Sequence, residues 1–257
     1  MKISFVILIK NELEEIKKLL AQLAPYVKEN GDEIIIVSDG PVEHEMYIAI
    51  SAWQPVIKKI ASRPLLGDFA SQRNYADSLC SADSDYIFHL DADEYLRTEC
   101  LENLREILEA NPEVDLFKLP RVNIVRGIVE ADVKTWRWTV CGLDEFIDDI
   151  KLPMTSDYYS FLVKSGLVIS SNDIGHGELQ VSYKLPIVNW HPPYCDHQGR
   201  LYKNNKQMKW VGAVHEAIQN ASIETVVPAM VELSIIHDKS IARQRKQNAF
   251  YSEILTK

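Results

Sequence analysis

The chain has little cysteine and no long apolar run. Among its 257 residues no two cysteines form a Cys-x-x-Cys pair, which argues against both a zinc knuckle and a disulfide scaffold. We therefore expect reduced thiols in a cytoplasmic protein. Residues 3–9 form an apolar run that is too short for a signal-peptide core or a membrane span, so we interpret it as a buried first strand. The four cysteines are Cys80, Cys100, Cys141 and Cys195.

Positive charge is also scarce. Lysine and arginine together number 28, against 37 acidic residues, so the net charge is -9. The chain lacks the basic field that usually accompanies nucleic-acid binding, and a DNA or RNA partner is disfavoured. Repeats and low-complexity segments are absent, and the length suits a single α/β domain with at most one appended lobe.

The first half of the chain alternates strand-like and helix-like segments. This order predicts a βαβα series around a mostly parallel sheet, whose strands are apolar throughout because both faces are covered. The expected strands are residues 3–9, 32–38, 56–61 and 86–90, and the expected helices are residues 12–26, 43–53 and 69–80.

The pattern loosens after residue 94. We expect a helix over residues 98–110, a strand over 114–119, and a basic, then amphipathic helix over 241–254 that docks with a solvated positive face. Residues 121–185 are aromatic and irregular. Their rings either pack the core of a smaller lobe or form a platform on which an acceptor sugar stacks. These aromatic residues include Trp136, Trp138, Tyr158, Tyr159 and Phe161.

Three polar clusters fall where predicted strands end. Residues 10–12 follow the first strand, Asp39 follows the second, and residues 91–94 follow the fourth. Ligands bind beyond the carboxyl ends of the strands in sheets of this kind. We therefore expect the three loops to converge on one site.

Asp91 and Asp93 are the most informative pair. Alternate residues of an extended chain point to the same side, so both carboxylates can face one ligand. Hard oxygen donors suit Mg²⁺ or Mn²⁺, which commonly carry a diphosphate. The alternative is a solvated turn leading into the next helix. Because like charges repel, we expect the pair to be loosely held without a cation.

Six motifs in a fixed order carry a family resemblance. They are Lys10-Asn11-Glu12 and residues 68–74, 90–94, 119–123, 199–204 and 214–216. Together they resemble the family 2 glycosyltransferases of GT-A fold, particularly the bacterial branch that includes lipopolysaccharide-core sugar transferases, over roughly residues 3 to 237. The resemblance implies an α/β fold with a mostly parallel central sheet flanked by helices. It also implies a nucleotide-sugar-binding half over residues 1–120, and an acceptor-side lobe with the C-terminal helix over 121–257.

The implied activity is a metal-dependent, inverting sugar transfer. The donor would be a nucleotide-diphosphate sugar with UDP as its carrier, and the acceptor a hydroxyl of a glycan, glycolipid or other molecule. Mn²⁺ or Mg²⁺ would be held by Asp91 and Asp93, with His215 or His237 completing the shell. Asp39 is followed by Gly40-Pro41 where the family more often has Asp-x-x-Ser-x-Asp. The donor-binding residues implied by the resemblance are Lys10, Asn11, Glu12, Asp39, Gln72, Arg73, Asn74, Asp91 and Arg200.

An inverting transferase also needs a base that removes the proton of the acceptor hydroxyl. The base must lie across the pocket from Asp93, because the acceptor attacks from the face opposite the diphosphate. Glu216 is the first candidate and Asp196 the second. For each, the alternative is an acid that only bonds a neighbouring histidine or amide.

Rival functions remain beside this one. A sugar nucleotidyltransferase needs a glycine-rich loop after the first strand, and residues 10–13 contain no glycine. A catalytically silent carbohydrate- or nucleotide-sugar-binding protein would share the fold, and a transferase acting on DNA or a peptide would share the chemistry. The sequence leaves open the transferred sugar, the linkage, the oligomeric state and a peripheral contact with the inner face of the membrane.

Overall fold

The structure, a computed structural model, describes residues 1–205 and 207–256. The chain packs into two compact units. The first contains residues 1–120 and 197–235 and the chain from residue 251, and the second contains residues 121–196 and 236–250. The predicted division into a donor half and an acceptor half concerns function and stays a prediction.

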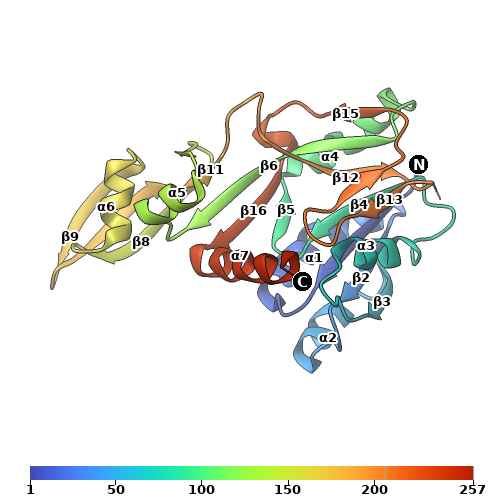
Figure 1. The fold of residues 1–257 in the computed structure, drawn as a ribbon, viewed down its shortest axis with the longest axis horizontal. Coiled ribbons are helices and arrows are strands. Elements are labelled where there is room, and N and C mark those ends of the chain that lie inside the picture. Colours follow the sequence, from blue (N-terminus) through green and yellow to red (C-terminus); the bar gives the residue numbers. More distant parts are fainter. Residues whose placement is uncertain (206, 257) are drawn as a thin grey trace. The chain divides into compact units, whose positions relative to one another are not determined.

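A parallel sheet forms the centre of the first unit (Figure 1). Its strands follow the order β3-β2-β1-β4, and all neighbours in this series run parallel. Strand β12 adds to β4 in the antiparallel direction, and β15 pairs with the start of β6. The bounds are β1 Ile3–Ile9, β2 Glu33–Ser38, β3 Ile57–Ser62, β4 Tyr86–Asp91, β5 Glu94–Leu96, β6 Leu116–Arg126, β12 Asp196–Lys203 and β15 Glu224–Val226.

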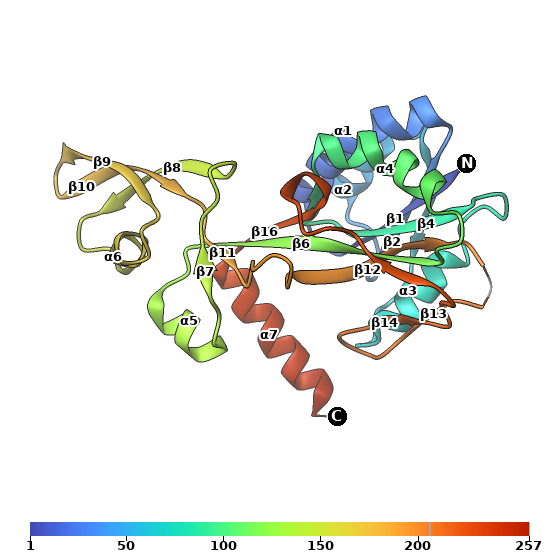
Figure 2. The ribbon, with the colours of Figure 1, turned by 90° about the horizontal axis from the view of Figure 1, so that it is seen from above.

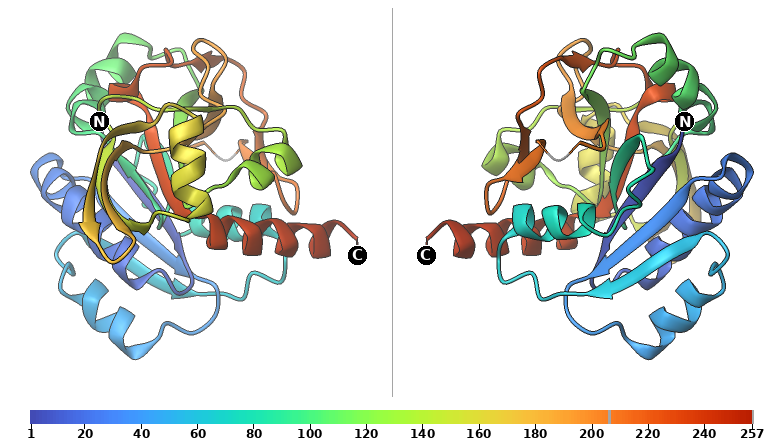
Figure 3. Two further views of the ribbon diagram at one scale, coloured as in Figure 1. Left: turned by 90° about the vertical axis from the view of Figure 1, so that its left-hand side faces the viewer. Right: turned by 90° about the vertical axis from the view of Figure 1, so that its right-hand side faces the viewer.

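Helices cover both faces of this sheet because its side chains alternate. Phe5 and Ile7 pack in the cluster that contains α1, α2 and α4, whereas Val6 packs in the cluster that contains α3 and the hairpin β13-β14. Figures 2 and 3 show α1 and α3 on opposite sides of the parallel strands. These elements are α1 Leu13–Asn30, α2 His44–Ser51, α3 Phe69–Asp77, α4 Thr98–Ala110, β13 Lys209–Val211, β14 Ala217–Gln219 and the short 3₁₀ helix η1 Val231–Leu233.

Capping residues define the end of helix α1 and the start of helix α3. Helix α1 stops at Gly31, whose φ of 71° suits glycine and whose N–H bonds the carbonyl of Val27. Helix α3 begins after Asp68, whose carboxylate accepts a hydrogen bond of 2.9 Å from the N–H of Ser71. The cap fixes where α3 starts and thereby the height of Arg73 on the helix.

The second unit contains a small antiparallel sheet of order β8-β10-β9, with α6 against it in Figure 1. Tyr158 of α6 meets Tyr183 of β10 edge to face at 5.9 Å between centroids. The remaining strands pair β11 with β6 and β7. The bounds are α5 Glu130–Trp136, β7 Val140–Cys141, β8 Ile147–Pro153, α6 Asp157–Lys164, β9 Val168–Gly175, β10 Glu178–Lys184, β11 Ile187–Val188, β16 Ile235–Ser240 and α7 Ile241–Leu255.

The predicted helices and strands are present, and most of their ends shift by a few residues. The strand expected over residues 114–119 extends to Arg126 as β6, and the short strand β5 was not predicted. Among the aromatic residues, Tyr158 and Phe161 are buried, as core packing predicts. Trp136 and Trp138 are half-buried, and their ring centroids lie 4.6 Å apart. Helix α7 buries none of its described residues, and Arg245 on it bonds the buried Asp132, so its positive face is not wholly solvated.

The cysteines permit a first prediction. All four are free thiols, and burial raises the pKa of Cys80 and of Cys100 to about 12. Because the thiolate is the nucleophile, iodoacetamide at pH 8 should leave both residues unmodified in the native protein. Mass spectrometry of the alkylated protein measures this. Modification of all four thiols in urea is the control, and rapid native alkylation of Cys100 would contradict the structure.

Candidate functional site

The polar loops lie at one edge of the parallel sheet. Leu8 of β1 is in register with Asp91 of β4, and Ile9 is in register with Ser38 of β2. The three strands therefore end at one level, and the residues that follow them share this edge. The predicted convergence of these loops is confirmed for the backbone.

Asp91 lies between two arginines. Its Oδ1 accepts a hydrogen bond of 2.9 Å from Arg73, and its Oδ2 accepts one of 2.8 Å from Arg200. The N–H of Asp91 donates to the carboxylate of Glu94 at 2.9 Å. Two cationic partners thus compensate the charge of Asp91. The expectation that the pair Asp91 and Asp93 is loosely held without a cation stays a prediction.

Arg73 is buried and bonds two carboxylates of this region. Its side chain is only 2% exposed, and its Nε donates to Glu216 at 2.7 Å while Nη2 donates to Asp91. The guanidinium also lies over the ring of Trp210 at 4.9 Å from the centroid. We infer that Arg73 orients Asp91 and Glu216, because its own donors are already directed at them.

Arg200 approaches Asp91 from strand β12. It is 5% exposed, and its Nη2 also lies 3.6 Å from the buried carboxylate of Glu94. In the described part of the chain, its Nε and Nη1 are buried without a hydrogen-bond partner. Unsatisfied buried N–H groups of a cation are costly. Beside Asp91, they are donors suited to an anion or a water molecule.

The local charges can accommodate a divalent cation. Three carboxylates (Asp91, Glu94 and Glu216) pair with the two guanidinium groups, and Asp93 follows in the turn after β4, so acidic groups outnumber these two arginines. No group of three or more His, Cys, Asp or Glu residues suited to a metal occurs in residues 1–205 and 207–256. A Mg²⁺ or Mn²⁺ ion bound by one or two carboxylates usually completes its shell with phosphate oxygens and water. The residues fit such a site.

The other predicted ligands are placed differently. Asp93 lies in the turn between β4 and β5 and is half-buried. His215 is exposed at a backbone φ of 55°, and its ring meets Tyr251 at 5.6 Å. His237 is in the second unit, 6% exposed, with Nδ1 at 3.1 Å from Oδ1 of Asn123. The roles of all three as ligands stay predictions.

The first loop is tied to Asp39. Lys10 donates from Nζ to Oδ2 of Asp39 at 2.8 Å, and the N–H of Leu65 donates to Oδ1 at 2.8 Å. Burial alone would raise the pKa of Asp39, but these hydrogen bonds outweigh it and lower the pKa. The carboxylate of Glu12 accepts from the N–H groups of Lys10 and Asn11. The loop is therefore preorganised around two carboxylates.

Two predicted donor contacts on α3 bond the protein itself. Gln72 is 2% exposed, accepts from Arg63 at 2.8 Å and donates to the carbonyl of Arg63 at 2.9 Å. Asn74 pairs both ends of its amide with the backbone of Trp210, at 2.8 and 3.0 Å. These bonds hold α3 against neighbouring segments, and a contact of either residue with the donor stays a prediction.

The two candidate bases lie in different clusters. Glu216 bonds Arg73 on the side of Asp91 and is 13% exposed. Asp196 accepts at Oδ2 from Nε and Nη2 of Arg121, at 3.0 and 2.7 Å, and from Asn123 at 2.9 Å. Asn123 therefore links Asp196 with His237. Each carboxylate is held by an arginine.

Sequence reasoning missed the buried residues behind Arg73. His89 is fully buried on β4, and its Nε2 lies 2.6 Å from Asp77, which also accepts from Tyr202 at 2.8 Å. Burial lowers the pKa of His89, although Asp77 acts in the opposite direction. One signal could have found it: His89 interrupts an apolar strand two residues before Asp91, and so shares its side of β4.

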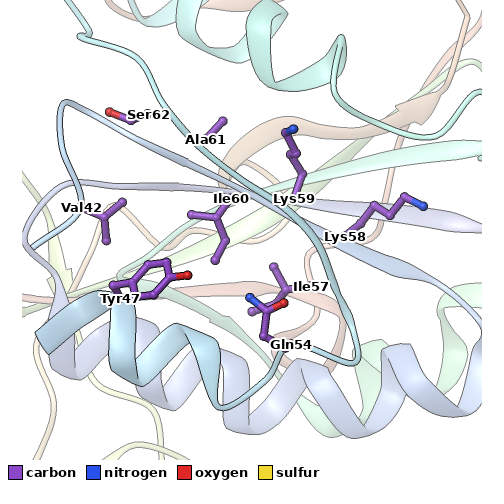
Figure 4. A pocket seen from close by; sticks show the side chains of 9 residues that line it. All are labelled: Val42, Tyr47, Gln54, Ile57, Lys58, Lys59, Ile60, Ala61 and Ser62. Atoms are coloured by element: carbon purple, nitrogen blue, oxygen red, sulfur yellow. The ribbon is translucent and has the colours of Figure 1, made fainter. Parts of the chain in front are cut away.

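A hollow of about 360 Å³ lies elsewhere in the first unit, beside α2 and the edge strand β3. Figure 4 shows its lining side chains, which include Tyr47, Gln54 and Ile57. None of the predicted site residues lines it. Over residues 1–205 and 207–256, no helix has both the length and the apolar character needed to cross a bilayer.

Comparison with known proteins agrees with this architecture. "Crystal structure of S. aureus TarS 1-349" aligns with a TM-score of 0.51 at 12% identity, covering 93% of this chain and 60% of that one. The same protein in complex with UDP-GlcNAc gives 0.52 at 13%, covering 93% and 59%, and in complex with UDP 0.52 at 12%, covering 99% and 65%. The chain thus spans about 60% of the length of these structures.

The comparison with curated proteins found no match. The model of glycosyl transferase family 2 matches residues 4–165, more than half of the chain. The mostly parallel sheet flanked by helices is the predicted GT-A fold, whereas the resemblance to the lipopolysaccharide-core branch stays a prediction. The chain belongs to glycosyl transferase family 2.

Proposed function

We propose that the protein transfers a sugar from a nucleotide-diphosphate donor to a hydroxyl acceptor. The observation that carries the proposal is Asp91, held by Arg73 and Arg200 at the carboxyl end of β4 and followed by Asp93 in the next turn. This arrangement belongs to a family 2 chain. Structures of TarS with UDP-GlcNAc and UDP support UDP as the carrier.

Asp93, with Asp91 beside it, would hold the divalent cation. A cation there stabilises the negative charge that develops on the diphosphate when the glycosidic bond breaks. Arg200 adds the unsatisfied N–H groups of its Nε and Nη1 nitrogens for an anionic group next to Asp91. Asp39 and the loop of residues 10–12 would bind base and ribose, because their carboxylates are already oriented by Lys10 and backbone N–H groups.

The acceptor hydroxyl would be deprotonated by one of the two candidate bases, Glu216 or Asp196. Glu216 is bonded to the arginine that also holds Asp91, so it can act as the base only if it faces the acceptor rather than the diphosphate. Inversion requires the base on the opposite face. The half-buried pair Trp136 and Trp138 supports a sugar-containing acceptor, a glycan or glycolipid, because exposed ring faces stack on the apolar faces of sugars.

Isothermal titration calorimetry with UDP tests the donor site. We expect UDP to bind in the presence of Mn²⁺ and to bind much more weakly after EDTA treatment, because the carboxylates and the diphosphate repel each other without the cation. A panel of nucleotide sugars, assayed for metal-dependent release of the nucleotide, then identifies the donor. Equal UDP binding with and without metal would contradict metal dependence, and no binding of any nucleotide would contradict the function.

Two substitutions distinguish between the candidate bases. If Asp196 is the base, Asp196→Asn should lower transfer on the order of 10²-fold to 10⁴-fold while leaving UDP affinity unchanged, because it removes only the proton acceptor. Glu216→Gln should weaken UDP binding as well, since Arg73 loses a charged partner. Steady-state kinetics with the identified donor, and UDP titration of each variant, measure these effects. Full transfer by Asp196→Asn would exclude it as the base.

A further inference from the structure

The guanidinium group of Arg73 contacts two residues of strand β4, His89 and Asp91. Arg73 donates through Nη2 to Asp91, and its Nη1 lies 3.4 Å from Nδ1 of His89. Residues i and i+2 of a strand point to the same side, so His89 and Asp91 present their side chains to Arg73 together. The contact with His89 therefore sets the position of the group that holds Asp91.

The hydrogen bonds determine the tautomer of His89. A guanidinium has donors and no acceptor, so Nδ1 of His89 must offer its lone pair to Arg73. The ring proton then lies on Nε2 and is donated to Oδ1 of Asp77 at 2.6 Å. Asp77 stands four residues after Arg73 on α3, so both residues project from the same face of the helix.

Aromatic residues close the network on the far side. Tyr202 donates to Oδ2 of Asp77 at 2.8 Å and accepts from the indole N–H of Trp210 at 2.9 Å. The ring of Tyr202 stacks on His89, with centroids 6.0 Å apart and an interplanar angle of 11°. The imidazole is held by Asp77 at one nitrogen and by Tyr202 over its face, which leaves it little freedom to turn.

We propose that His89 is a positioning residue for the donor site: in its Nε2–H tautomer it fixes Arg73, and through Arg73 the orientation of Asp91. This inference rests on the proposed function for its consequence in UDP binding. The proposal gives a role to His89, the only charged or imidazole side chain within residues 86–90, which are otherwise apolar or aromatic.

Three variants of the full chain test the proposal. His89→Leu removes both nitrogens. His89→Asn keeps an amide oxygen near the position of Nδ1, so it should restore the bond to Arg73. Asp32→Asn is the control: Asp32 has a side chain with 0% exposure that bonds Arg105 and the N–H of Ile3. It lies roughly 16 Å from Asp91 along the strands.

The first readout needs no ligand. Nuclear magnetic resonance of ¹⁵N-labelled protein should show the Nε2–H tautomer of His89. It should also show a side-chain Nη1–H signal of Arg73, the group that contacts His89, which is lost in His89→Leu and retained in His89→Asn. An Nδ1–H tautomer, or an unchanged Arg73 signal in His89→Leu, would overturn the proposal.

The second readout is UDP binding with Mn²⁺. We expect His89→Leu to weaken it on the order of tenfold or more, as loss of a supporting partner behind a metal site does, with recovery in His89→Asn. Asp32→Asn should bind UDP like the wild type even if its melting temperature falls as far as that of His89→Leu. Equal losses in Asp32→Asn and His89→Leu at equal melting temperature would make His89 merely structural. If the wild type binds no UDP, the proposed function fails, and the resonance data still decide the role of His89.

Discussion

Asp93→Ala should lower turnover about a thousandfold and abolish metal-dependent UDP binding. The carboxylate lies in the turn that follows β4, beside Asp91, whose own oxygens are bonded to Arg73 and Arg200. We propose Asp93 as the principal carboxylate ligand of the cation, because the resemblance to family 2 implies this role for it. Loss of a transition-state interaction worth ~4 kcal/mol corresponds to about three orders of magnitude in rate.

The measurement is release of UDP from the donor that the wild type consumes, together with UDP titration in Mn²⁺. Asp83→Ala is a matched control, because Asp83 is 75% exposed, precedes β4 and pairs with Lys2. The control should keep both properties. Turnover of Asp93→Ala within tenfold of the wild type would exclude Asp93 from the metal site.

Arg73→Leu should destabilise the first unit by about 3 kcal/mol. The substitution removes the guanidinium group that pairs with both Glu216, which is 13% exposed, and Asp91, which is 31% exposed. Both carboxylates retain some contact with water, so the expected loss is at the lower end of the range for a broken buried pair. The melting temperature should fall by roughly 6–12 °C.

A double-mutant cycle distinguishes this electrostatic effect from lost packing. Arg73→Leu combined with Glu216→Leu removes the uncompensated carboxylate, so part of the stability should return. Arg73→Lys keeps the charge but not the planar fork, and should lie between the wild type and Arg73→Leu. Thermal unfolding followed by circular dichroism measures five proteins: the wild type, Arg73→Leu, Glu216→Leu, their combination, and Arg73→Lys. Additive losses in the double variant would show that Arg73 acts by packing alone.

Much of the fold follows from local patterns. The apolar runs and helical spacings of the first half predicted β1 to β4 and α1 to α4, because a strand or helix shows its periodicity within its own residues. The helices and strands within residues 121–185 could not be predicted in this way. Its small sheet has an exposed strand, β9, whose residues Ser170 and Asn172 carry no apolar signal.

The sequence by itself determined the family, the parallel direction of the first strands and the edge of the sheet at which the segments containing Asp39, Asp91 and Asp93 lie, because strand ends define the edge of a parallel sheet. Only the tertiary structure decided what holds Asp91. Arg73 is 18 positions away in the chain and Arg200 is 109, and each reaches Asp91 from a separate element. No local pattern encodes such a pairing, since it depends on how α3 and β12 pack beside β4. For the same reason the sequence did not reveal that His89 contacts Arg73.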